Sequence, residues 1–198
     1  MERVNKARRA LAEGTGNFRH QDRAGLRRLL TGVVLFSLVA GMQGQIATEY
    51  QVKAAFLFNF AKFVEWPPSS FSDASTPLRI CVLGRDPFGQ ELRDLVSAKT
   101  VQGRKLEVDP VVNLQQARSC HILFIASSEK TSARILEGLR GASVLTVGDT
   151  KGFAGQGVMI NFVLENDRVQ FEVNPKAAEQ AGLKISSKLL SVAKLVLA

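Results

Sequence analysis

The apolar segment HILFIA, residues 121–126, most constrains the fold of this chain. It alternates neither with period 2 nor with period 3.6, so it is typical of a strand that is covered on both faces. Strands of that kind occur in sheets with helices packed on each side, because a buried sheet must have both faces shielded from water. The segment therefore predicts an α/β fold with a largely parallel sheet.

The rest of the chain alternates between strand-like and helix-like segments, as such a fold requires. Helices are expected over residues 50–65, 87–96, 114–117 and 131–139, and from Pro175 onward with a break near Gly182. Strands are expected over residues 78–83, 106–112, 121–126 and 143–147, and over 158–164 and 168–173, which flank a hairpin turn at 165–167. We expect a three-layer α/β sandwich. Its sheet would have five or six strands, mostly parallel, with a late antiparallel hairpin and helices on both faces.

The N-terminal region has the order of a secretory signal. Arg23, Arg27 and Arg28 precede a 12-residue apolar run at 29–40, and small residues follow it. This run is shorter than the ~20 residues that cross a bilayer comfortably. We expect residues 1–44 to be a leader and residues 45–198 to form one domain. The alternative is a buried hydrophobic helix or an uncleaved anchor.

The net charge of +8 is concentrated in that leader. Residues 1–44 hold 8 Lys/Arg and 3 Asp/Glu, whereas residues 45–198 hold 18 and 15. Nucleic-acid binding requires a basic stripe that follows the phosphate backbone, and the nearly balanced body carries none. Nucleic acid is therefore not an expected partner.

The sequence of the body offers no catalytic or metal-binding set. It has no G-x-S-x-G motif, and the loop at 84–89 is not a G-x-G-x-x-G loop, since Pro87 removes a backbone donor. Its single histidine, His121, starts an apolar strand and is expected to be a satisfied residue at the edge of the core. A zinc site needs three or four ligands. We expect no enzyme activity, no metal and no cofactor.

Cys81 and Cys120 are the only cysteines. In an exported protein an even pair suggests a disulfide, whereas in the cytosol two buried free thiols would be the default. Cys81 lies early in one expected strand and Cys120 directly precedes another. If those strands are parallel neighbours ~4.8 Å apart, their starts can be bridged. A Cys81–Cys120 disulfide is the prediction, and it depends on export.

The first expected helix has more aromatic residues than one buried face requires. Phe58 falls between Lys62 and Glu65 at 100° per residue, away from Phe56 and Phe63. Either a neighbouring loop covers Phe58, or Phe58, Lys62 and Glu65 contact a second subunit or another protein.

Five stretches of the chain together resemble the YfiR family. They are KAAFLFNFAKFVEWP at 53–67, ICVLGRDPFG at 80–89, CHILFIASSE at 120–129, LTVGDTKGFA at 145–154 and FEVNPKAAEQAGLKISSKLLSVAKLV at 171–196. The resemblance implies a periplasmic repressor, often a homodimer. Such a repressor binds the periplasmic domain of an inner-membrane GGDEF-type diguanylate cyclase, and an outer-membrane OmpA-like lipoprotein sequesters it. Lower cyclic di-GMP and control of biofilm formation would follow.

A periplasmic module that binds a small ligand is the alternative function. Open α/β sheets bind ligands at the carboxyl ends of their strands, where Arg85, Asp86, Phe88 and Asp149 are expected. This alternative needs no cyclase.

We predict that the mature protein begins near residue 42, after the small residues Val39-Ala40-Gly41. N-terminal sequencing of protein taken from the periplasm is the measurement. Recovery of residues 1–40 intact on a cytoplasmic protein would contradict export.

Overall fold

The computed structural model describes residues 48–197, so the predicted leader lies outside the described part of the chain. The helices are α3 (Glu49–Phe63), α4 (Gln90–Ser97), α5 (Leu114–Ala117), α6 (Ser132–Gly138), α7 (Pro175–Gln180) and α8 (Ser187–Ser191), with 3-10 turns η1 (Pro68–Ser70) and η2 (Phe153–Gln156). The strands are β1 (Val64–Glu65), β2 (Leu78–Leu83), β3 (Thr100–Val101), β4 (Arg104–Val111), β5 (Ile122–Ile125), β6 (Leu145–Gly148), β7 (Ile160–Glu165), β8 (Arg168–Val173), β9 (Lys184–Ile185) and β10 (Leu195–Val196).

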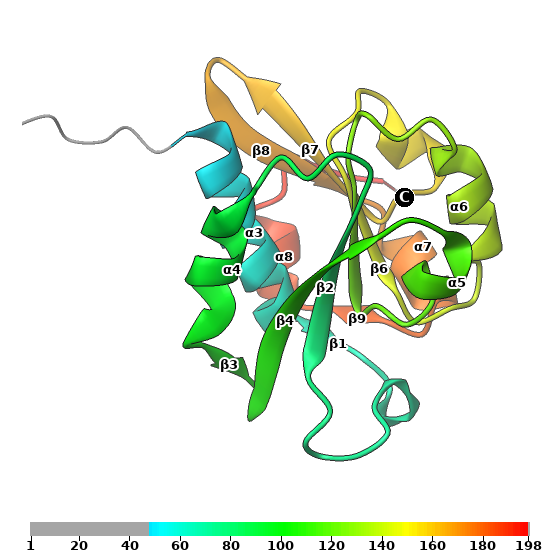
Figure 1. Cartoon of the computed structure of the whole chain (residues 1–198). Helices are drawn as coiled ribbons and strands as arrows, with labels where there is room; N and C mark the ends of the chain where they lie inside the picture. Colours follow the sequence, from blue (N-terminus) through cyan, green and yellow to red (C-terminus); the bar gives the residue numbers. More distant parts are fainter. Residues whose placement is uncertain (1–47, 198) are drawn as a thin grey trace, which may run out of the picture. The chain divides into compact units, whose positions relative to one another are not determined.

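The main sheet has the order β10-β8-β7-β6-β5-β2-β4-β3 (Figure 1). From β4 to β7 neighbouring strands are parallel, and β8 returns antiparallel to β7 across a turn at Asn166 and Asp167, both of which have positive φ. The expected α/β sandwich with a late hairpin is confirmed. The sheet exceeds the expected five or six strands because the two-residue strands β3 and β10 extend its two edges.

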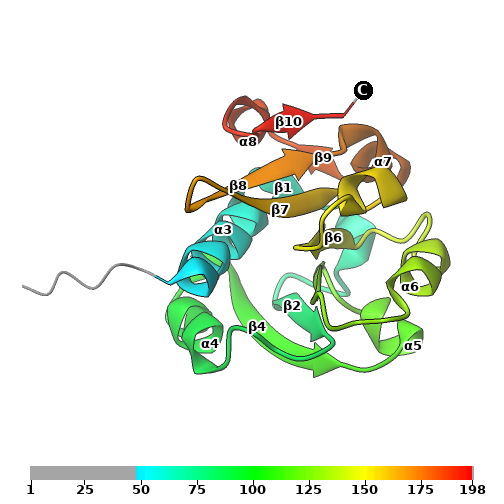
Figure 2. The ribbon, with the colours of Figure 1, turned by 90° about the horizontal axis from the view of Figure 1, so that it is seen from above.

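Helices cover both faces of the sheet (Figure 2). The helices α3 and α4 lie on one side, and α5 and α6 on the other. Each side encloses its own hydrophobic core. The strand β5 supplies Phe124 to the α3/α4 core and Leu123 to the α5/α6 core, and both side chains are fully buried. This is the two-sided burial that the apolar run at 121–126 predicts.

The helix α3 begins at a capping box, in which Thr48 accepts a hydrogen bond from the Gln51 amide and the Gln51 side chain bonds back. Its most buried residues are Lys53, Ala54, Leu57, Phe60 and Ala61. Helical spacing set Phe56 and Phe63 apart from Phe58 as the core-facing rings, but all three rings are only partly buried against this core.

The C-terminal segment is not the broken helix that the sequence suggested. Gly182, with φ +73°, follows the end of α7, and β9 then pairs antiparallel with β1 (Val64 opposite Ile185). Ser186 caps α8, and β10 runs parallel to β8. Short pairings with distant strands here outweigh the local helical pattern.

The predicted disulfide joins Cys81 and Cys120. Cys81 lies in β2 and Cys120 stands two residues before β5, and these two strands are parallel neighbours. Their Cα atoms lie 6.0 Å apart, within the usual range for a disulfide. Both cysteines are buried in the α5/α6 core, so the bridge ties two central strands together.

We expect the Cys81→Ala/Cys120→Ala variant to lose about 4 kcal/mol of unfolding free energy, because the bridge closes a loop of about 40 residues in the unfolded chain. Urea denaturation followed by circular dichroism measures the loss. Wild-type protein unfolded and refolded in reductant should match the variant. A difference below about 1 kcal/mol would mean that the bridge contributes little to stability.

Candidate functional site

The C-terminal half of α3 presents a basic and aromatic surface, which we call the α3 surface: Phe58, Lys62, Glu65 and Lys99. The Phe58 ring is partly buried, with Lys62 Nζ 5.6 Å and Lys99 Nζ 4.8 Å from its centroid. Phe58 is therefore covered in part by Lys62 of its own helix and by Lys99, which lies in the connection between α4 and β3. Both ammonium groups lie within the ~6 Å range of a cation–π interaction with the ring.

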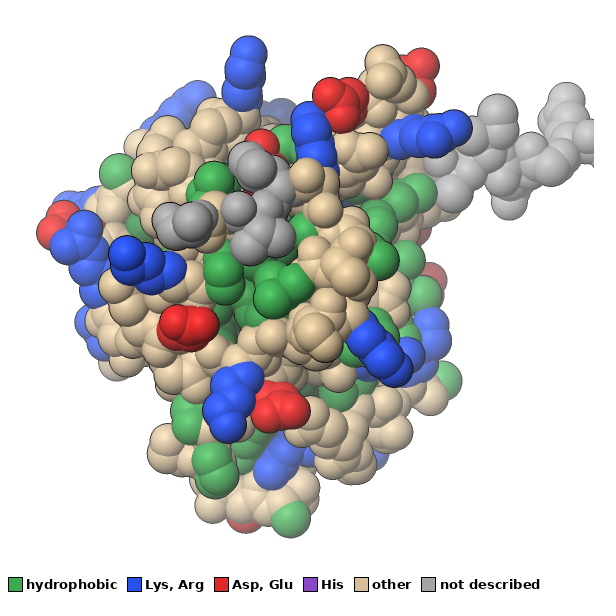
Figure 3. Space-filling view, turned by 180° about the vertical axis from the view of Figure 1, so that it is seen from behind, with side chains coloured by type: hydrophobic (Ala, Val, Ile, Leu, Met, Phe, Trp, Pro, Cys, Tyr) green, Lys and Arg blue, Asp and Glu red, His purple; other side chains and the backbone are tan. Residues whose placement is uncertain are grey.

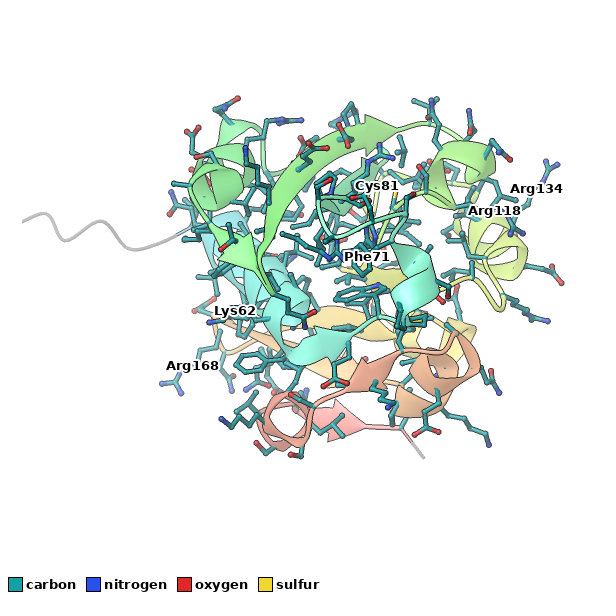
Figure 4. The ribbon with its side chains drawn as sticks, turned by 90° about the horizontal axis from the view of Figure 1, so that it is seen from below. Lys62, Phe71, Cys81, Arg118, Arg134 and Arg168 are labelled. Carbon is teal, nitrogen blue, oxygen red and sulfur yellow. A yellow bond between two sulfur atoms is a disulfide. The ribbon has the colours of Figure 1, made fainter. Side chains whose placement is uncertain are left out.

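The charged side chains of the α3 surface are not neutralised by other described residues. Within residues 48–197, Lys62, Glu65 and Lys99 form no ion pair. Glu65 is exposed and lies in β1, opposite Lys184 of β9. Figure 4 shows Lys62 and Arg134 on opposite sides of the domain. On the face in Figure 3, acidic and basic side chains are interspersed and hydrophobic side chains gather near the middle.

The residues expected at the carboxyl edge of the sheet make mostly internal contacts. Asp86 Oδ1 accepts hydrogen bonds from the amides of Phe88 (2.8 Å) and Gly89 (3.2 Å). The Phe88 ring is buried and lies edge-on to Phe124, with centroids 4.8 Å apart. Arg85 is exposed, and its amide donates to Ser128 Oγ. Their role in ligand binding stays a prediction.

Asp149 belongs to a buried polar cluster that links this edge to the start of α3. Its Oδ2 lies 3.0 Å from both Lys53 Nζ and the Tyr50 hydroxyl, and Lys53 Nζ also lies 2.5 Å from Glu49 Oε1. Tyr50 packs edge-on to Phe88 as well, with centroids 5.6 Å apart. Through Tyr50, the structure brings Asp149 and Phe88 into one cluster.

Burial and the neighbouring carboxylates shift the pKa of Lys53 in opposite directions. Burial lowers the pKa of Lys53, but hydrogen bonds to Glu49 and Asp149 outweigh it, so the pKa lies above its ordinary value. Burial, together with Asp149, raises the pKa of Tyr50. Lys53 thus stays charged in the interior and acts as the resident counter-ion of Asp149.

The sequence analysis did not identify Lys53 as a site residue, although its position in the helix indicates burial. Lys53 precedes Leu57, Phe60 and Ala61 by four, seven and eight positions, which is the spacing of the buried face of α3. A lysine on such a face requires a buried acidic partner.

Two further searches of residues 48–197 concern metals and membranes. In this range no three His, Cys, Asp or Glu side chains come together as metal ligands would. Nor does any helix there have the length and apolar character needed to span a bilayer.

A family model described as YfiR/HmsC-like matches residues 50–194, which is nearly the whole described domain. The chain belongs to the YfiR/HmsC-like family. The α3 surface, the disulfide and the Tyr50–Lys53–Asp149 contacts, here called the Lys53 cluster, all lie within the matched residues. The resemblance seen in the five sequence stretches is confirmed.

Two solved structures are similar to this chain at low sequence identity. A conserved domain protein from Vibrio cholerae O1 biovar El Tor is 15% identical, with a TM-score of 0.47, over 76% of this chain and 60% of that one. An ABC domain in complex with L-Trp from Streptococcus pneumonia is 10% identical, with a TM-score of 0.43, over 60% and 55%. The chain thus spans less than two thirds of either structure. No curated protein matches the chain.

We expect Lys53→Met to cost about 3–5 kcal/mol of unfolding free energy, because it leaves the buried Asp149 carboxylate without its cation. Lys53→Met/Asp149→Asn should recover part of the loss, since the carboxamide still accepts the Tyr50 hydrogen bond and buries no charge. Urea denaturation of the two variants and of Asp149→Asn gives the coupling free energy. A loss below about 1 kcal/mol in Lys53→Met would contradict the role of Lys53 as counter-ion.

Proposed function

We propose that this protein is a periplasmic regulator that binds and represses an inner-membrane GGDEF-type diguanylate cyclase. Membership of the YfiR/HmsC-like family carries the proposal. In this proposal the protein acts by occupying the periplasmic domain of the cyclase, without chemistry of its own. The repressed cyclase makes less cyclic di-GMP, which lowers biofilm formation.

The disulfide supports a periplasmic location. A structural bridge between Cys81 and Cys120 persists only in an oxidising compartment, and the periplasm is one. The predicted signal at residues 29–40 would deliver the chain there. In the same proposal the protein is a homodimer, and an OmpA-like outer-membrane lipoprotein sequesters it and so releases the cyclase.

The α3 surface is the contact that we propose for the cyclase. Phe58 supplies apolar area, and aromatic rings contribute much of the energy at protein interfaces. Lys62 and Lys99 carry positive charges that no acidic side chain of residues 48–197 pairs with. A complementary partner surface would present carboxylates to the two lysines around an apolar centre.

We expect Lys62→Glu to weaken capture of the cyclase's periplasmic domain at least tenfold and to leave the thermal midpoint of unfolding nearly unchanged, because Lys62 is exposed and forms no described ion pair. Phe58→Ala should weaken capture as well. Calorimetry with the two purified domains measures the affinity.

The matched control is Arg134→Glu, which makes the same charge change on the opposite side of the domain (Figure 4) and should leave the affinity intact. Equal loss in both variants would point to net charge instead of the α3 surface. Deletion of the gene should raise cyclic di-GMP in the host when the cyclase is expressed. An unchanged level would contradict repression and favour the small-ligand alternative.

A further inference from the structure

The connection between β1 and β2, residues 66–77, packs against one buried histidine. His121 is buried, and its ring stacks on Phe71 with centroids 4.4 Å apart. His121 Nε2 lies 3.1 Å from the Ser70 carbonyl oxygen, and the Trp66 indole donates to the His121 carbonyl. We call this segment the 66–77 loop. Phe71 and Cys81 are labelled in Figure 4.

Arg104 of β4 holds the other side of Phe71. Its guanidinium carbon lies 3.8 Å from the Phe71 centroid, and Nη1 donates to the carbonyls of Asp73 (2.7 Å) and Thr76 (2.8 Å). The loop is therefore fixed by a stack of guanidinium, phenyl ring and imidazole. Arg104 belongs to β4, His121 directly precedes β5, and Phe71 belongs to the loop.

The hydrogen bonds of the imidazole allow only its neutral form. The Arg79 amide donates to Nδ1 over 3.0 Å, so Nδ1 must carry a lone pair. The Ser70 carbonyl can only accept, so the ring proton sits on Nε2. A second proton, on Nδ1, would remove the bond from Arg79 and set two N–H groups against each other.

The surroundings of the imidazole also disfavour its protonated form. Burial lowers the pKa of His121, and Arg104 of β4 and Arg79 of β2 lower it further, which outweighs the opposite effect of the bond to Ser70. The Arg79 guanidinium pairs with Asp109, and Asp73 bonds within the loop. The folded state therefore disfavours protonation, and stability falls as the pH drops below the unfolded-state value of about 6.5.

We propose that His121 is a pH switch for the 66–77 loop: when Nδ1 takes up a proton, its new N–H opposes the Arg79 amide, the ring is displaced, and the loop that the ring contacts through Phe71 and Ser70 loosens from the sheet. The switch is a property of the domain and does not rest on the proposed cyclase partner. A protein in the periplasm would sense acid through it. Because the loop continues directly from Glu65, its release would also reach the α3 surface.

The chain supplies its own reporter for this switch, since Trp66 is its only tryptophan. We expect Trp66 emission of the full chain to change reversibly between pH 8 and pH 5, with a midpoint below about 6.5 and a slope of one proton. His121→Asn, whose side-chain oxygen can accept from Arg79 but does not titrate, should abolish the transition. His20→Gln, which changes the only other histidine, should keep it.

A second measurement on the wild type does not depend on the variant. Hydrogen exchange, corrected for its intrinsic pH dependence, should rise in residues 66–77 at pH 5, while α4 keeps its protection. A flat emission profile, a transition that survives in His121→Asn, or loss of protection across the whole domain would each overturn the proposal. The last of these outcomes would show acid unfolding instead of a local switch.

Discussion

The two-sided burial of β5 is the constraint on which the rest of the domain depends. All four of its residues are buried, and they alternate between the α3/α4 core and the α5/α6 core. A strand with no exposed face needs a paired strand on each edge and a helical layer on each side. The strands β2 and β6 pair with its two edges, and the helices cover its two faces. The disulfide to Cys81 and the His121 contacts both lie at the amino end of this strand.

The sequence predicts the central sheet well because buried positions are occupied by apolar residue types. The apolar run at 121–126, the hairpin around residues 165–167 and the Cys81–Cys120 bridge are all confirmed, and each depends on local pattern or on the adjacency of parallel strands. The position of Phe58 beside Lys62 follows from helical spacing. Periodicity could not show that Lys99, which follows α4, would lie against the same ring.

The remaining features arise from contacts between distant residues, which no local pattern records. The strands β9 and β10 have two residues each, which is too few for a recognisable strand pattern. The helical spacing of the residues around them therefore predicts a helix instead. The Lys53 cluster joins residues 96 positions apart, and the Arg79 to His121 bond spans 42. A lysine or a histidine in an apolar stretch signals that a partner is needed, but the fold decides which residue is the partner.

The pairing of β1 with β9 has a consequence for how the domain is assembled. Val64 and Ile185 are 121 positions apart, so this pairing has one of the highest sequence separations in the fold. Closing so long a segment of chain is slow, because its entropy must be lost before the contact is gained. Of the described elements, α3 is synthesised first, yet the strand β1 that follows it pairs only when β9 has been made. An early element of the domain is therefore completed by one of the last.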